Sequence, residues 1–109
     1  MPITTTRLAL VHVRVAVTDL RAALGADGQP ATLVFTSLTL AVVTPAAGIR
    51  IPVTALAQRS PGIHQLGLRP RDADRLRAAA GDATFADLVL TATTLTITTA
   101  AATVTVGRW

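Results

Sequence analysis

Residues 33–53 read LVFTSLTLAVVTPAAGIRIPV, and residues 88–108 read LVLTATTLTITTAAATVTVGR. Aligned without a gap, the two segments carry the same residue at eight positions, and their apolar alternation and turn position also coincide. These identities are Leu33/Leu88, Val34/Val89, Thr36/Thr91, Thr39/Thr94, Leu40/Leu95, Thr44/Thr99, Ala46/Ala101 and Ala47/Ala102. Because an internal repeat constrains the whole architecture, it predicts a chain built of two similar halves.

Length and composition narrow the class of protein. A chain of 109 residues corresponds to one domain, and 50% hydrophobic with only 15% charged residues argues against intrinsic disorder. No apolar run approaches the roughly 20 residues that a membrane helix needs. The N-terminus does not resemble a signal peptide, and the absence of cysteine excludes disulfides and thiolate chemistry. We therefore expect a cytoplasmic protein that is not embedded in a membrane.

The charged residues are unusual in kind. All ten basic residues are arginine and all six acidic ones are aspartate, while lysine, glutamate, asparagine and tyrosine are absent. A GC-rich genome accounts for such a bias, and chemistry that requires one of the missing side chains is excluded. The net charge of +4 tolerates anionic partners. The arginines are scattered and only three aromatic residues are present, so nucleic acid is not the expected partner.

The first half begins with the stretch from Leu8 to Val17, where apolar and polar residues alternate as in a half-buried strand. Thr18 and Asp19 offer an N-cap for a short helix over 20–24, which Gly25 ends. Further strands are predicted at 31–35, 38–43 and 49–53. Pro52 places the last of them at a sheet edge or a bulge.

The second half repeats this order after the segment AQRSPG, residues 57–62. A strand is predicted at 63–69, with His64, Leu66 and Leu68 on one face. Asp72 can cap a helix over 73–80, which Gly81 and Asp82 end. Three more strands are predicted at 87–90, 94–98 and 103–108, where threonine favours strand. The PH-like barrel of bacteria is an alternative fold, but it would need a C-terminal helix where strands are predicted.

Both halves therefore read strand, helix and three strands. The predicted fold class is α+β, with two pseudo-symmetric β-α-β-β-β modules forming a paired half-barrel. The single domain covers 1–109, with module one at 1–56, a linker at 57–62 and module two at 63–109. One module alone would leave its apolar face uncovered, so two are expected to share a core.

The plan resembles the vicinal oxygen chelate superfamily, which includes glyoxalase and the bleomycin-resistance proteins. In that family a histidine heads the strand that opens a module and an aspartate eight residues later begins the helix, as in the segment from His64 to Asp72. In active members the opening histidine and a glutamate of the fourth strand bind a divalent metal. Here Val11 stands at the first histidine position, and Pro52 and Gly107 stand at the glutamate positions.

The resemblance thus implies a metal-free member, with neither a metal site nor a cofactor. His12 lies one residue beyond Val11, and strict alternation directs it to the other sheet face, beside Arg14 on the surface or at a dimer contact. The expected function is metal-independent binding of an apolar or anionic small molecule in a trough between the modules. Homodimers are common in this superfamily, so a homodimer is expected.

Four residues are candidates for contact with the ligand. His64 aligns with a family site position, and the alternative is a partly buried histidine at a strand start. Arg50 shares the parity of Pro52 and could grip a carboxylate or phosphate, unless it faces solvent. Thr105 and Trp109 share the parity of Gly107, and Trp109 could stack on an aromatic ligand, pack on a partner or fray.

Two other functions stay open. One is a metal-free isomerase or cyclase that uses His64 as acid or base. The other is a β-rich subunit of a larger structural assembly. The cluster of Arg69, Arg71, Arg75 and Arg77 with Asp72 and Asp74 is interpreted as a solvated helix face with local ion pairs, and an anion-binding patch is the alternative.

Overall fold

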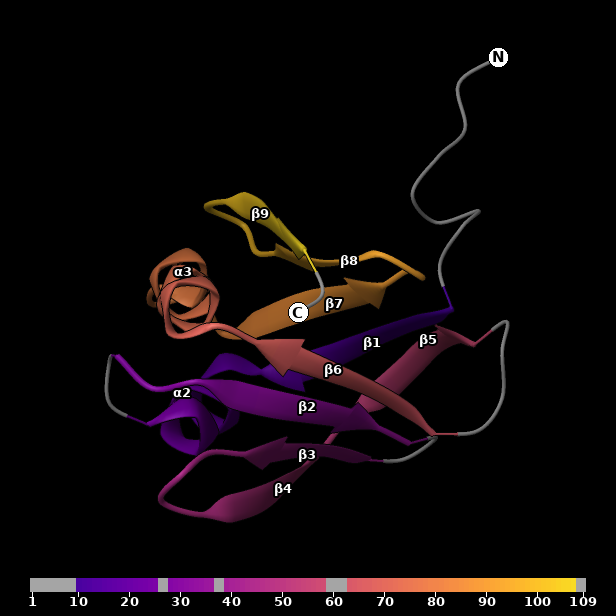
Figure 1. Cartoon of the computed structure of the whole chain (residues 1–109). Coiled ribbons are helices and arrows are strands. Elements are labelled where there is room, and N and C mark those ends of the chain that lie inside the picture. Colours follow the sequence, from indigo (N-terminus) through magenta and orange to yellow (C-terminus); the bar gives the residue numbers. More distant parts are fainter. Residues whose placement is uncertain (1–9, 26–27, 37–38, 59–62, 108–109) are drawn as a thin grey trace.

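The computed structural model places the two matched segments in two separate antiparallel sheets (Figure 1). It describes residues 10–25, 28–36, 39–58 and 63–107. In chain order the elements are β1 (Val11–Ala16), α2 (Val17–Leu24), β2 (Ala31–Phe35), β3 (Thr39–Val43), β4 (Gly48–Pro52), β5 (Thr54–Gln58), β6 (His64–Leu68), α3 (Pro70–Ala80), β7 (Phe85–Leu90), β8 (Thr94–Thr98) and β9 (Thr103–Gly107). The predicted α+β class is confirmed.

Each sheet combines strands from both halves of the chain. The five-stranded sheet has the order β5-β1-β7-β8-β9, and the four-stranded sheet has the order β4-β3-β2-β6. The opening strand of the first half, β1, therefore pairs with β7 of the second half, and β6 pairs with β2 of the first. This exchange ties the two halves together by backbone hydrogen bonds.

The two matched segments pair their strands in the same register. Leu33 lies opposite Val42 and Leu40 opposite Ile51 in the four-stranded sheet. The residues 55 positions later repeat these pairs, with Leu88 opposite Ile97 and Leu95 opposite Val106 in the five-stranded sheet. The sequence repeat is thus a repeat of strand pairing, which propensity alone would not require.

The threonines shared by the two segments form the turns between the strands. The Thr36 amide donates to the Thr39 carbonyl at 3.0 Å, and the Thr91 amide donates to Thr94 at 2.9 Å. The two hydroxyl groups within each pair also lie 2.9 and 2.8 Å apart. In the next turn, the amides of Thr44 and Thr99 donate to the carbonyls three residues ahead, both at 2.8 Å. The hydroxyl groups of Thr36, Thr44, Thr91 and Thr99 also accept hydrogen bonds from the amides three residues ahead, which explains why threonine recurs in these turns.

One hydrophobic core joins the sheets and helices. α2 packs on β3 and β4, α3 packs on β8 and β9, and the two helices contact each other on one side of the molecule (Figure 1). The largest fully buried side chains come from both sheets and both helices: Phe35, Leu20, Leu24, Leu33, Leu40, Leu66, Leu68, Leu76, Leu88, Leu90, Leu95 and Ile97. Burial of each contributes about 1.5–3 kcal/mol, so this shared core is the main stabilising term.

The helix starts differ from those predicted. α2 begins at Val17 with Ala16 as N-cap, so Thr18 and Asp19 lie inside its first turn. α3 begins at Pro70, and Asp72 is a buried residue of the first turn and not the cap. Proline is favoured at the first helical position because its missing N–H would have no partner there. Asp19 and Asp72 still lie in the first turns, where a carboxylate interacts favourably with the positive end of the helix dipole.

The strand β5 was not predicted. Residues 54–58 pair with β1, so Ala57 and Gln58 of the predicted linker belong to a strand, and residues 59–62 lie outside the described part. The β1–β5 register contains an irregularity between His12 and Val13. Only the tertiary structure supplies the open edge of β1 that makes this short segment a strand. Pro52 does lie on an edge strand, β4, as predicted.

Neither helix among the described residues is long and apolar enough to cross a membrane.

Candidate functional site

The residues predicted to contact a ligand do not converge in the described structure. His64, on the edge strand β6, pairs with Phe35 and shares the core-facing side of the four-stranded sheet. Arg50 lies on β4 at the opposite edge and pairs with Ala41 on the outer side. Thr105 belongs to the other sheet, where its hydroxyl lies 2.9 Å from that of Thr96. Trp109 lies outside the described residues.

The positions that the family resemblance aligns with metal ligands are also separated. Pro52 pairs with Thr39 on the outer side of the four-stranded sheet, whereas His64 faces inward from the other edge. Among the described residues, no group of three or more His, Cys, Asp or Glu side chains is arranged to hold a metal ion. A catalytic divalent site normally needs about three such ligands. The described residues therefore do not fit the metal of this superfamily.

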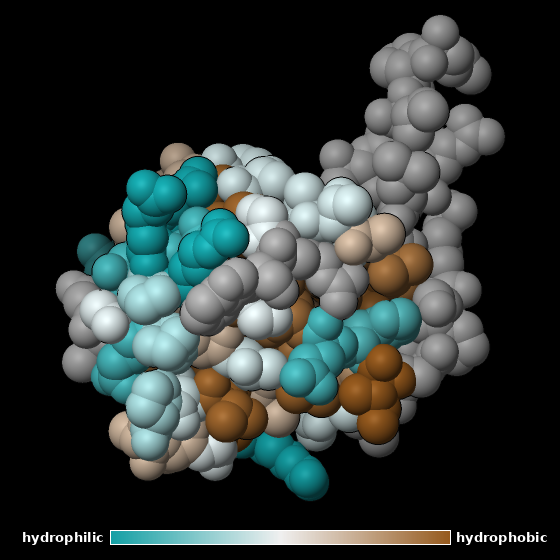
Figure 2. Space-filling view, in the orientation of Figure 1, coloured by the Kyte–Doolittle hydropathy of each residue, from teal (hydrophilic) through white to brown (hydrophobic). Residues whose placement is uncertain are grey.

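A hollow lies between α2 and α3 instead. Its volume is about 680 Å³, and it is open to solvent. It is lined by Val17, Thr18, Arg21, Ala22, Gly25, Arg77, Gly81, Asp82 and Ala83. We call it the interhelical groove. Figure 2 shows hydrophilic side chains gathered over the α3 side of the molecule.

Both helices end at the groove in the same way. The amide of Gly25 donates to the carbonyl of Arg21 at 3.1 Å, and the amide of Gly81 donates to the carbonyl of Arg77 at 3.2 Å. Both glycines have positive φ angles, +69° and +53°. Glycine adopts this conformation without the steric cost that a Cβ would add, so it ends each helix sharply.

Each of these arginines then reaches across to the other helix. Arg21 Nη1 donates to the Gly81 carbonyl at 2.8 Å, and Arg77 Nε donates to the Gly25 carbonyl at 2.9 Å. The last carbonyls of a helix lack partners within the helix and carry the negative end of its dipole. The two guanidinium groups therefore satisfy these carbonyls and offset their charge, and they hold the two helix ends together.

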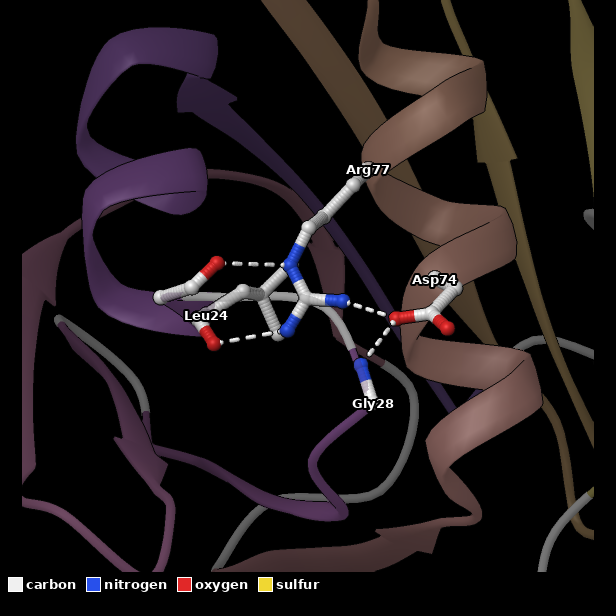
Figure 3. Close-up of polar contacts among 5 residues, drawn as sticks. Leu24, Gly28, Asp74 and Arg77 are labelled. Atoms are coloured by element: carbon white, nitrogen blue, oxygen red, sulfur yellow. Dashed lines mark hydrogen bonds and ion pairs between the residues drawn. The ribbon is translucent and has the colours of Figure 1, made fainter.

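Arg77 is the more deeply engaged of the two. Its Nη2 donates to the Leu24 carbonyl at 2.8 Å, and its Nη1 contacts Asp74, which in turn accepts from the Gly28 amide at 3.0 Å (Figure 3). The side chain is only 10% exposed. The expectation of a solvated arginine is wrong here, because most of the Arg77 side chain is covered where it links α3 to the end of α2. Its neighbour Arg75 is half exposed and lies 3.7 Å from Asp72, as predicted for local ion pairs.

Arg21 keeps free donor capacity. Its side chain is about half exposed, and Nη1 also lies 3.9 Å from Asp82, which is fully exposed. Within the described part of the chain, no hydrogen bond uses its Nε or Nη2. A guanidinium fixed at one nitrogen and open at the others is suited to bind a carboxylate or phosphate.

The sequence contains a repeat that relates Arg21 to Arg77. LRAALG at 20–25 and LRAAAG at 76–81 are nearly the same six residues. They place an arginine four residues before the glycine that ends each helix.

A second polar cluster lies on the outer side of the five-stranded sheet. Arg14 Nε donates to Asp87 Oδ1 at 2.8 Å, and His12 Nε2 lies 3.5 Å from Asp87 Oδ2. The His12 Nε2 atom is buried and forms no hydrogen bond in the described structure. The hydrogen bond from Arg14 lowers the pKa of Asp87; partial burial opposes this shift, and the positive charge of Arg14 adds to it. The same hydrogen bond raises the pKa of Arg14.

Asp87→Asn should lower the free energy of unfolding at neutral pH, because the ionised carboxylate is stabilised in the folded state. Since the folded pKa lies below the ordinary value of 3.8, this contribution is present above pH 3.8. It is lost as the pH falls through the folded pKa. Urea unfolding at several pH values should therefore show the wild type and variant converging in acid. Asp82→Asn, at an exposed site, is the control and should show no such convergence.

A comparison with models of known protein families and a comparison with curated proteins both find no match for this chain.

Proposed function

We propose that the protein binds a small anionic ligand, without a metal ion, in the interhelical groove. The observation that carries the proposal is Arg21, whose guanidinium is held at the Gly81 carbonyl and keeps its Nε and Nη2 available in a hollow of about 680 Å³. This volume lies within the range of about 300–1,000 Å³ typical of small-molecule sites. The proposed ligand belongs to the class that the sequence predicted. The site that we propose for it is the interhelical groove and not a trough between the modules.

The charge around the groove supports an anion of modest affinity. The negative ends of the two helix dipoles meet there, but Arg21 and Arg77 cover their terminal carbonyls. Arg77 contributes fixed positive charge, because its donors are already engaged. Asp82 opposes an anion, since its carboxylate lies 3.9 Å from Arg21 Nη1. Binding should therefore weaken with ionic strength, as expected for a partly exposed charge.

The groove also has an apolar side that narrows the ligand class. Val17, Ala22 and Ala83 line it together with the Thr18 hydroxyl. A carboxylate or phosphate on a small apolar body would place its anionic group on Arg21 and its body against these side chains. This combination matches the expectation of an apolar or anionic metabolite.

Arg21→Ala should weaken binding of inorganic phosphate and of succinate about tenfold or more in isothermal titration calorimetry at low salt. A charge-assisted hydrogen bond contributes about 1.5–3 kcal/mol, and about 1.4 kcal/mol corresponds to tenfold in affinity. Arg75→Ala removes an equally exposed arginine of α3 that does not line the groove and should leave both affinities unchanged. Asp82→Asn should tighten binding.

Equal affinities in wild type and Arg21→Ala would contradict the proposal, as would no binding of either anion by the wild type. Addition of a chelator should leave the wild-type affinity unchanged, since the proposal needs no metal. His64→Ala should also bind normally, because His64 does not line the groove. A metal-free isomerase or cyclase using His64 would instead lose its reaction in that variant.

The predictions about the duplicated fold, the family relation and the location of the protein are kept as part of this proposal. The common register of the two segments supports a duplicated β-α-β-β-β unit, and the paired half-barrel and the relation to the vicinal oxygen chelate superfamily are kept as hypotheses. The absence of cysteine is consistent with the proposed cytoplasmic location.

A further inference from the structure

The two sheets have four edge strands, and these edges are not equivalent. β5 and β9 border the five-stranded sheet, and β4 and β6 border the four-stranded sheet. An edge strand presents backbone N–H and C=O groups that can pair with another chain, so proteins usually protect edges with charges, proline or bulges.

The hydrogen-bond alternation identifies which groups of β9 face away from β8. The Thr99 amide donates to the Ala102 carbonyl, so this pair is hydrogen-bonded. In an antiparallel ladder, bonded and non-bonded pairs alternate. The pairs of Thr98 with Thr103, Thr96 with Thr105 and Thr94 with Gly107 are then the non-bonded ones. The amide and carbonyl groups of Thr103, Thr105 and Gly107 therefore point to the open edge.

The contact of Arg75 with Thr105 agrees with this assignment. Arg75 Nη2 donates to the Thr105 carbonyl at 3.4 Å, near the upper limit for a hydrogen bond. Within the described residues, no hydrogen bond satisfies the outward amide groups of Thr103, Thr105 or Gly107. The strand is regular in register and contains no charged residue and no proline, and the charge that lies at this edge comes from Arg75 of α3.

The other three edges each carry a protective feature. The β4 residues that occupy the same ladder positions as Thr103, Thr105 and Gly107 are Gly48, Arg50 and Pro52. There proline removes an outward donor and arginine places a charge at the edge. The pairing of β5 with β1 is irregular. In β6, Gly67 lacks a side chain to pack and weakens the strand, and His64 and Gln65 take part in further interactions.

We propose that β9 pairs antiparallel with β9 of a second copy of this chain, about a twofold axis at Thr105. Such pairing sets Thr105 opposite Thr105, Thr103 opposite Gly107 and Val104 opposite Val106. The paired residues are uncharged, and threonine–threonine and apolar pairs stabilise antiparallel strands. Pairing replaces the long contact of Arg75 with the Thr105 carbonyl. The five-stranded sheets of two copies become one continuous sheet. An interface that uses the same strand twice closes on itself as a dimer.

The dimer is expected to be weak, because a five-residue strand makes a smaller interface than the roughly 1,600 Å² of a standard one. Sedimentation equilibrium and light scattering should be measured up to about 1 mM protein, where even a dimer with a Kd of about 1 mM is visible. The wild type should shift from monomer to dimer mass as its concentration rises.

The two related edges provide matched variants. Thr105→Arg combined with Gly107→Pro gives β9 the protection of β4, and a side chain at 107 meets no atom within 4 Å. This variant should stay monomeric at every concentration. The reciprocal variant, Arg50→Thr with Pro52→Gly, leaves β9 intact and should keep the wild-type dimer. Circular dichroism and thermal melting verify that each variant is folded.

A wild type that stays monomeric, or a Thr105→Arg, Gly107→Pro variant that is folded and still dimeric, would overturn the proposal. Open-ended growth of the wild type would also overturn it, because that result requires β9 to pair with a different edge. Arg21→Ala should dimerise like the wild type, so this test is independent of ligand binding in the groove.

Discussion

Leu33→Ala and Leu88→Ala should each lower the free energy of unfolding by about 2–5 kcal/mol, which is the usual cost of removing a buried leucine side chain. Both side chains are fully buried. Leu33 lies on β2, which pairs with β6 of the other half, and Leu88 lies on β7, which pairs with β1 of the other half. Leu33 lies between Val42 and Leu66, and Leu88 lies between Ile97 and Val13. The two losses should be similar, because the positions are related by the repeat.

The matched controls are Val34→Ala and Val89→Ala. These valines follow the two leucines in the chain and lie on the outer, half-buried side of the same strands. They should cost distinctly less, since little cavity forms at an exposed face. Urea unfolding followed by circular dichroism measures all four variants. Full loss at Leu33 with none at Leu88 would show that the C-terminal half does not share the core.

Arg77→Ala is expected to lower the free energy of unfolding by about 2–4 kcal/mol, although it removes a charged residue from a helix. The substitution leaves the carbonyls of Leu24 and Gly25 without their donor and leaves Asp74 without its cation. Because the Arg77 side chain is 10% exposed, water cannot fully replace these hydrogen bonds.

Arg75→Ala provides the control on the same helix. Its side chain is half exposed and lies 3.7 Å from Asp72, so its loss should cost about 0.5 kcal/mol. Arg77→Lys should recover little, because an ammonium group cannot reach both carbonyls as the planar guanidinium does. Equal stability of Arg77→Ala and Arg75→Ala would show that the link between the helices contributes little.

Most elements could be predicted from local pattern. The strand at 31–35 and the strand at 94–98 have the predicted bounds, and Gly25 and Gly81 end the two helices as predicted. These features could be predicted because the alternation of apolar and polar residues in a strand, and the positive φ of a glycine that ends a helix, depend on neighbouring residues alone. β5 could not be found in this way, since its strand conformation depends on pairing with β1.

The candidate site was mostly not predicted. Arg50 and Thr105 were placed in a trough by parity along their own strands, and that parity is retained by the structure. Parity does not say which sheet each strand joins, and the two residues belong to different sheets. Arg21 was overlooked, because its role depends on the carbonyl of Gly81, 60 residues away.

By itself, the sequence determined the repeat, the order of the strands and helices apart from β5, and the residues that face the core. Each of these follows from spacing along the chain, which hydrophobic burial and turn geometry translate directly into local structure. Only the tertiary structure decided that β1 and β6 each join the sheet of the other half, that Arg77 links the ends of the two helices and that β9 is an open edge. These features depend on contacts between distant segments, whose energies no local pattern encodes.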